Sequence, residues 1–193
     1  MPAKVSVRTG AAEPSGSLVQ IPKALLRKRR SEILAETAAS LLRGLSPDIV
    51  VLPALYRALA AERIVDASLG FIVTDVDAST MSLGFIKGFP PAVAQRCLTL
   101  DFGQAVCGTV ALRRTAMHVT DIQRSLDPIC DLVRDAGMTA YACEPLFVGD
   151  RLLGTLSFAS RSRRSFDAED LLFFRAIAKH VALARDRAMA AAA

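Results

Sequence analysis

The sequence of 193 residues has no tryptophan, only two histidines and four cysteines, and no long uninterrupted apolar run. No stretch approaches the roughly 20 apolar residues that a transmembrane helix needs, so no membrane span is predicted. The N-terminus carries charges at Lys4 and Arg8 without an apolar run behind them, which is not the pattern of a secretory signal. A chain with few cysteines and no export signal is expected in the reducing cytoplasm, where disulfides are rare.

The sequence also lacks the spacings that mark metal sites and phosphate-binding loops. His118 and His180 stand far apart without a metal-ligand spacing around them, so no metal site is predicted. Gly103 and Gly108 do not form a phosphate-binding loop. The sequence therefore predicts no particular cofactor. A cyclic nucleotide stays an open alternative, because a pocket that binds one through mixed polar and backbone contacts has no clear sequence pattern.

Basic side chains gather near the N-terminus, although the net charge of the chain is only +5. Residues 1–30 hold seven lysines and arginines against one glutamate, whereas the remaining residues carry 17 basic and 18 acidic side chains. The run Arg27–Arg30 has the charge to contact nucleic acid or acidic lipid. No DNA-reading motif accompanies it, so a solvated helix start is the expected role and nucleic acid is not an expected partner.

The pattern along the chain predicts one α+β domain over residues 22–193, preceded by a disordered basic tail over residues 1–21. A long final helix is expected to begin at a Ser165 cap and to continue to about residue 190. Before it, helices are predicted at 22–42, 47–64, 91–96, 106–112 and 126–135, and strands at 67–76, 80–88, 97–100, 117–120, 138–148 and 151–160.

Several short segments, taken in their order and spacing, resemble the GAF domain family. They are Gly88-Phe89-Pro90, residues 102–108, 119–122, 137–146, 151–158 and 166–170. The resemblance spans about Pro47 to Arg187 and is strongest to the sensory GAF domains of bacterial histidine kinases. It implies a six-stranded antiparallel sheet in the order 3-2-1-6-5-4, with the terminal helices on one face and short pocket helices on the other.

The resemblance further implies a non-catalytic sensory or regulatory domain that binds a small ligand or a partner protein. Such a domain signals through flanking helices that form a homodimer, with a protein such as a histidine kinase as its signalling partner. Both terminal helices of this chain carry more apolar surface than one face of a sheet needs. The residues expected to line the ligand pocket are Phe71, Val73, Leu83, Phe85, Cys107, Val110, Ile129, Val133, Tyr141, Cys143 and Phe158.

The cysteines suggest an enzyme as the alternative. Cys97, Cys107 and Cys130 are separated by nine and 22 residues, which nearly reproduces the spacing of the free methionine-(R)-sulfoxide reductases, enzymes of GAF fold. That resemblance implies thiolate attack on the sulfoxide followed by disulfide formation. The chain departs from that family because Tyr141 and Ser157 stand where the reductases carry acidic residues.

Two further alternatives remain. Covalent bilin attachment is disfavoured, because Pro128-Ile129 replaces the cysteine and histidine of bilin-binding GAF relatives. An interaction module that uses the basic N-terminal segment to meet a kinase, nucleic acid or a membrane surface is the last alternative.

Overall fold

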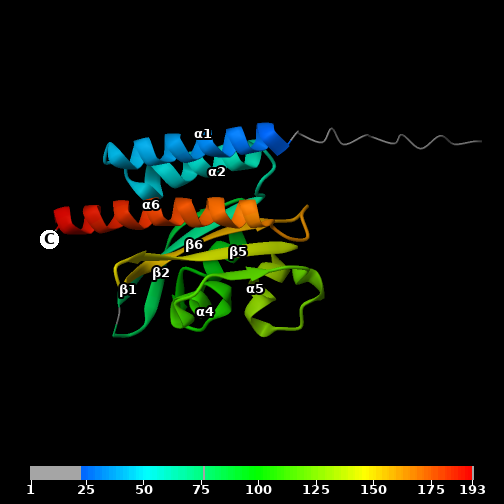
Figure 1. The fold of residues 1–193 in the computed structure, drawn as a ribbon. Helices are drawn as coiled ribbons and strands as arrows, with labels where there is room; N and C mark the ends of the chain where they lie inside the picture. The colour runs from blue at the N-terminus through cyan, green and yellow to red at the C-terminus, as the bar shows by residue number, and fades with distance from the viewer. Residues whose placement is uncertain (1–22, 76, 193) are drawn as a thin grey trace, which may run out of the picture.

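The structure is a computed structural model that describes residues 23–75 and 77–192 (Figure 1). The predicted basic tail, residues 1–21, lies outside the described residues. The helices are α1 (Lys23–Leu42), α2 (Leu52–Ala61), α3 (Pro91–Arg96), α4 (Ala105–Arg113), α5 (Asp131–Asp135) and α6 (Ala168–Ala192), with short helical turns η1 (Pro47–Val51), η2 (Ile122–Arg124) and η3 (Pro128–Cys130). The strands are β1 (Ala67–Asp75), β2 (Thr80–Lys87), β3 (Thr99–Asp101), β4 (Met117–Val119), β5 (Ala140–Val148) and β6 (Arg151–Ser160).

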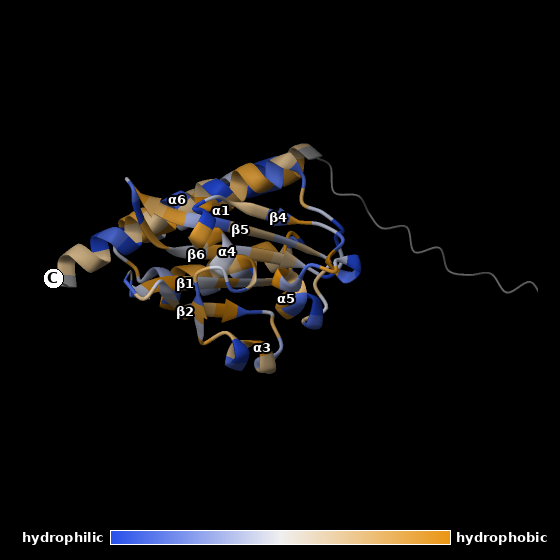
Figure 2. Ribbon diagram, turned by 90° about the horizontal axis from the view of Figure 1, so that it is seen from below, coloured by the Kyte–Doolittle hydropathy of each residue, from blue (hydrophilic) through white to orange (hydrophobic). Residues whose placement is uncertain are grey.

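The six strands form one antiparallel sheet in the order β3-β2-β1-β6-β5-β4, which confirms the predicted α+β class and strand order. Helices α1, α2 and α6 cover one face of the sheet, and α4 and α5 lie on the opposite face (Figure 1). Seen from that opposite face, α4 lies over the middle of the sheet and α3 lies beside the β2 edge (Figure 2). The molecule is therefore built of three layers.

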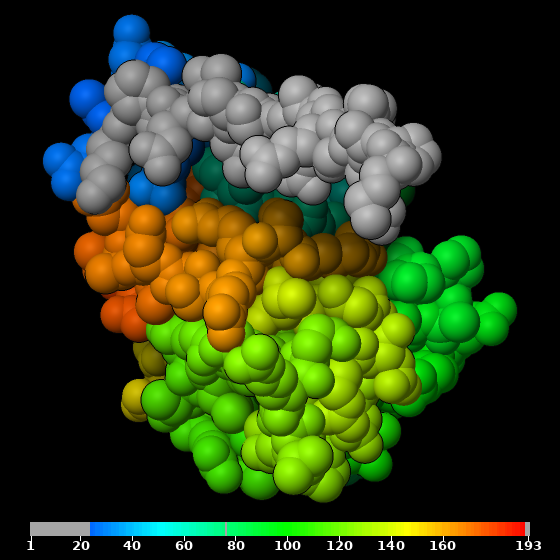
Figure 3. Space-filling view, turned by 90° about the vertical axis from the view of Figure 1, so that its right-hand side faces the viewer, coloured from blue at the N-terminus to red at the C-terminus, as the bar shows by residue number. Residues whose placement is uncertain are grey.

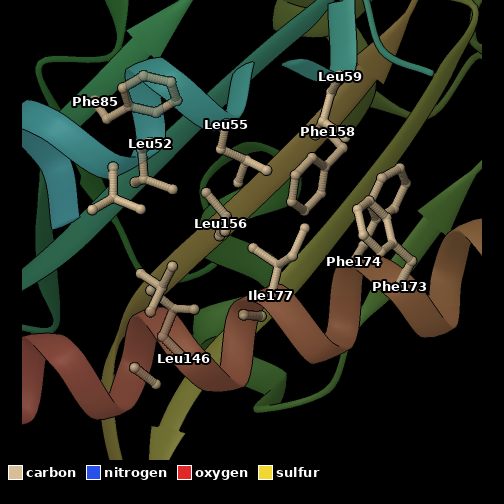
Figure 4. Packing of buried hydrophobic residues seen from close by; sticks show 14 of the residues in the cluster. Leu52, Leu55, Leu59, Phe85, Leu146, Leu156, Phe158, Phe173, Phe174 and Ile177 are labelled. Carbon is tan, nitrogen blue, oxygen red and sulfur yellow. The ribbon is translucent and has the colours of Figure 1, made fainter. Parts of the chain in front are cut away.

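The helical layer is held to the sheet by an apolar core from the two terminal helices, α2 and the strands. Phe158 of β6 stacks on Phe174 of α6 with ring centroids 4.0 Å apart (Figure 4). Leu59 of α2 and Ile177 of α6 are fully buried around this pair. Because a buried aromatic or leucine side chain contributes about 1.5–3 kcal/mol, this layer anchors α6 firmly to the sheet.

The start of α6 differs from the prediction of a Ser165 cap. The Asp170 amide donates to the Asp167 carboxylate over 2.8 Å, and the Asp167 amide donates to the Asp170 carboxylate over 3.2 Å. Asp167 is therefore the cap of the helix, and the two aspartates satisfy each other's backbone amides in a reciprocal capping arrangement. Ser165 lies ahead of this turn, so the predicted helix start was two residues early.

The basic run near the N-terminus folds onto the domain through ion pairs. Arg27 and Arg30 pair with Glu169, and Arg30 also pairs with the fully buried Asp170. Arg29 pairs with Glu62 over 2.9 Å. The pairs to Glu169 and Asp170 join the beginning of α1 to the first turn of α6, where negative side chains are favoured, and the Arg29 pair joins α1 to the end of α2. The arginines thus have a structural role inside the chain.

The two terminal helices run in the same direction. Their starts are joined by Arg30 and Asp170, and near their ends Arg187 donates to the Leu41 carbonyl over 2.8 Å. No helix among the described residues combines the length and the apolar character that crossing a membrane requires.

Candidate functional site

Most of the predicted pocket residues do meet in one place, between the sheet and α4. Phe71, Val110, Val133, Tyr141 and Cys143 are each at least 97% buried in a single cluster that also contains Cys107. Val73, Leu83 and Ile129 are partly buried and pack against that cluster. The segment from η2 to α5, yellow-green in Figure 3, forms a continuous surface below the orange start of α6. In this state the side chains of the cluster fill the space where a ligand was expected.

Phe85 and Phe158 lie on the opposite face of the sheet, in the core under α1, α2 and α6. Phe158 follows from strand alternation, because its neighbours Ser157 and Ala159 face α4. Phe85 is reversed by a β-bulge: Gly70 pairs with Phe85 while Phe71 pairs with Leu83, which leaves Gly84 as the extra residue. These two phenylalanines were therefore predicted on the wrong face.

Inside the apolar α4-side cluster, a few polar side chains lie together where α4 meets the sheet. This group consists of Cys107, Tyr141, Thr155 and Ser157. The Cys107 sulfur lies 3.2 Å from the Tyr141 hydroxyl and 3.3 Å from the Ser157 hydroxyl. Thr155, on the same face of β6, is fully buried beside Cys107 and Cys143. Its hydroxyl forms no hydrogen bond of normal geometry among the described residues, although it lies close enough to Cys107 and Cys143 to lower the pKa values of both thiols. An unsatisfied buried hydroxyl costs about 1–3 kcal/mol, so this closed arrangement leaves a polar demand unmet.

The cysteines on this face of the sheet differ in thiol pKa. Hydrogen bonds from Cys143, Ser157 and Tyr141 lower the pKa of the Cys107 thiol to about 7. Burial raises the pKa of Cys143 well above its ordinary value, and the negative charge on Cys107 raises it further. Burial also raises the pKa of Cys97 to about 11. Among Cys97, Cys107 and Cys143, Cys107 is therefore the thiol that ionises first.

The three cysteines of the reductase pattern all belong to the α4-side cluster, and all are buried and free. Among the described residues the buried carboxylates are Glu144 and Asp170, and both serve the helical face, with ion pairs to Arg175 and Arg30. No group of side chains with metal-ligand character gathers in the part of the chain that the structure describes. This face therefore offers hydroxyls and thiols, and among the described residues no buried carboxylate lies beside its cysteines.

A buried arginine of α6, which the sequence analysis did not predict, forms a second polar contact next to this cluster. Arg185 is only 4% exposed, and it donates to the Phe71 carbonyl over 2.7 Å and to the Asp48 carboxylate over 3.2 Å. A side chain at Gly154 would collide with the Phe71 carbonyl, and one at Gly84 would meet Ile72 at 2.8 Å. Glycines in strand interiors mark bulges and close approaches, so Gly84 and Gly154 were the available signal for this contact.

Phe71 takes part in both the α4-side cluster and the contact with Arg185. Its side chain packs in the α4-side cluster, while its backbone carbonyl, at the bulge, accepts from Arg185 on the helical face. Phe71 therefore connects the α4-side cluster to α6 through one hydrogen bond.

The strand order, the two-faced helical cover and the segment between β3 and β5 define a GAF-type fold. The family description "GAF domain" matches residues 29–184 of the sequence. The chain belongs to the GAF domain family. No curated protein matches the sequence with significance.

Solved structures share this fold at low sequence identity. The free methionine-R-sulfoxide reductase of Neisseria meningitidis, in complex with its substrate, is 19% identical with a TM-score of 0.68, covering 96% of this chain and 98% of its own. The GAF domain of a phosphoenolpyruvate-protein phosphotransferase from Coxiella burnetii is 21% identical with a TM-score of 0.71, covering 86% and 97%. The reduced form of fRMsr from Staphylococcus aureus is 21% identical with a TM-score of 0.63, covering 80% and 94%. At these identities the likeness shows the fold alone.

Proposed function

We propose that the chain is a non-catalytic sensory GAF domain that takes a small polar ligand between α4 and the sheet. The observation that carries the proposal is the group of buried polar side chains under α4, in which the Thr155 hydroxyl forms no hydrogen bond of normal geometry. Buried polar groups are normally satisfied, so an unsatisfied one calls for an explanation, such as a bound water, an ion or a ligand. A ligand that displaces α4 and hydrogen-bonds Thr155, Ser157 and Tyr141 removes this cost and stabilises an open state.

The open state communicates with the helices through Arg185. When Phe71 follows the ligand, its carbonyl moves relative to the Arg185 guanidinium, which is also tied to Asp48 in η1. The ligand then biases the position of α6 against η1 and α2. A ligand shifts such an equilibrium only by its difference in affinity for the two states, and the Thr155 hydroxyl supplies that difference.

In this proposal the signal is passed on at the outer surface of the α1–α6 pair, where a second copy of the chain packs to form a homodimer. Leu172 and Leu183 of α6 are 64% and 53% exposed and lie three turns apart on one helix face. Between α1 and α6 a groove of about 410 Å³ is lined by Arg27, Arg30, Ser31, Leu34, Glu169, Leu172, Phe173 and Ala176. Because α1 and α6 run in the same direction, a second copy on this face forms a four-helix bundle that passes the shift to a signalling partner. A histidine kinase in the cytoplasm is the partner that the resemblance favours.

The test compares the wild-type chain with Thr155→Val, which keeps the side-chain shape and removes the hydroxyl. Thermal unfolding of both proteins is followed with a panel of cyclic nucleotides, amino acids and 2-oxo acids. A pocket ligand present at 100 times its Kd stabilises the wild type by about 2.7 kcal/mol, and it stabilises Thr155→Val less. Thr37→Val is the matched control, because the Thr37 hydroxyl is buried but already donates to the Ile33 carbonyl over 2.7 Å. The proposal is contradicted if every compound of the panel stabilises the wild type and Thr155→Val against thermal unfolding to the same extent.

A thiol-based methionine sulfoxide reductase is the second candidate. The lowered pKa of Cys107 and the spacing of Cys97, Cys107 and Cys130 favour it. The raised pKa of Cys97 and the lack of a carboxylate beside these thiols oppose it, because reduction of the sulfoxide needs a proton donor at the leaving oxygen. Thioredoxin-coupled reduction of free methionine-(R)-sulfoxide, with Cys130→Ser as the control, decides between them. We expect no turnover in either protein.

A further inference from the structure

A separate hollow lies at the β4 edge of the sheet, between the end of α4, the start of β4 and α6. Strand β4 is the last strand of the sheet and extends beyond the cover of α6, which leaves a space of about 370 Å³ between β4, β5 and α6. Its walls are Arg114, Thr115, Ala116, His118, Glu144, Pro145, Phe147, Arg175, Ala178 and Lys179. A volume of this size lies within the range of small-molecule sites.

The hollow is positively charged around one buried carboxylate. Glu144, only 2% exposed, lies with its carboxylate 3.2 Å from His118 Nε2 and 3.5 Å from Arg175 Nε. Arg114 and Lys179 add two further cations to the wall, so three cations face one carboxylate even when His118 is not counted. The net positive charge favours an anion, because Glu144 neutralises only one of them.

Arg114 and Arg175 are held in place, and an apolar surface lies beside them. Arg114 ends α4 in the left-handed region, with φ 55° and ψ 29°. Its guanidinium stacks over the Phe147 ring at 4.8 Å and donates to the Asp150 carbonyl. Phe147, Pro145 and Ala178 give the hollow an apolar side. Fixed cations next to an apolar wall suit a ligand with both an anionic head and an apolar body.

We propose that this corner, between β4, β5 and α6, binds a small organic anion. Its carboxylate or phosphate head lies among Arg114, Arg175 and Lys179, and its apolar body lies on Phe147. Phe147 packs against the α4-side cluster at this edge of the sheet. The corner uses other polar side chains than the pocket under α4: Tyr141 and Cys143 face α4, whereas Glu144 alternates with them and faces α6. The inference therefore does not depend on the sensory function proposed above.

Amide NMR titrations of the full chain test the site with phenyl phosphate and benzoate as anionic probes, and with benzamide as the neutral probe of the same shape. We expect saturable shifts confined to residues 114–118, 144–147 and 175–179, which weaken as salt is added because exposed charges are screened. A stronger response to phenyl phosphate assigns a phosphate ligand, and a stronger response to benzoate assigns a carboxylate.

Two charge-removing variants complete the test. Lys179→Gln should weaken anion binding about fivefold, the effect of losing one partly exposed charge. Lys87→Gln removes an equally exposed lysine at the end of β2 and should leave binding unchanged. Benzamide binding as tightly as benzoate, equal weakening in both variants, or shifts scattered over the surface would each overturn the proposal.

Discussion

Removing the Arg185 guanidinium is the most informative single perturbation of the structure. Arg185→Met keeps the apolar stem of the side chain and deletes its contacts with Asp48 and with the Phe71 carbonyl. The Asp48 carboxylate, 16% exposed, then loses its cationic partner, and the bulge of β1 loses its donor. Breaking a buried ion pair from one side costs about 3–5 kcal/mol. We expect a loss of that size in the free energy of unfolding, from a total of about 5–15 kcal/mol for a native domain.

Urea denaturation followed by circular dichroism measures the effect, with Arg151→Met as the matched control. Arg151 also joins the sheet to α6, through Asp186, but its side chain is 56% exposed, so the same substitution should cost less than about 1 kcal/mol. A double-mutant cycle with Asp48→Asn then isolates the pair. Because the uncompensated charge is absent from the double mutant, the coupling free energy should be at least about 1.5 kcal/mol.

The reasoning is refuted if Arg185→Met destabilises the chain no more than Arg151→Met does. That result would mean that water reaches Asp48 and that the glycines at 84 and 154 serve another purpose. A large loss without coupling to Asp48 would instead assign the stabilisation to the Phe71 carbonyl alone.

Three further predictions follow from the two faces of the sheet. Thr155→Val should raise the free energy of unfolding of the ligand-free chain by roughly 1–2 kcal/mol in urea, because it removes an unsatisfied hydroxyl, whereas a decrease would show that the hydroxyl is satisfied. The folded Cys107 thiol ionises near pH 7, below the ordinary pKa of 9.0, so between these values the unfolded chain binds more protons and stability should rise with pH; Cys107→Ala should remove that slope in denaturation curves at pH 7 and 9. Leu172→Lys should make the chain monomeric in sedimentation equilibrium with little change in stability, and a monomeric wild type would contradict the dimer.

The arrangement of helices and strands could be predicted because each signal is local. The alternation in β5 and β6, the turn at Gly149-Asp150 and the apolar stripe of α6 all lie within short stretches of sequence. The family's short segments then supplied the strand order, which local patterns do not contain. The predicted ends of helices were less accurate. The cap of α6 is Asp167 and not Ser165, because the Asp167 carboxylate reaches the Asp170 amide, and only the three-dimensional structure shows which side chain does so.

The candidate site was harder because its features are contacts between distant segments. Phe85 was misplaced since a single bulge at Gly84 reverses every later side chain of β2. Arg185 was missed because an arginine near the end of an amphipathic helix ordinarily points into solvent, and nothing nearby in sequence indicates Asp48 as its partner. The same applies to the basic run at residues 27–30, whose acidic partners lie directly after α2 and in α6 as well as in α1.

The central claim, that the filled space under α4 opens to admit a ligand, is tested most directly by native-state labelling of Cys107. The chain is exposed to a thiol reagent at increasing urea, and the modified peptides are quantified by mass spectrometry. If α4 opens locally, Cys107 is labelled faster than global unfolding allows, and its rate hardly changes at low urea because little surface is exposed. If Cys107 is labelled only with the rate and urea dependence of global unfolding, the layer is a permanently closed core and the proposed pocket does not exist.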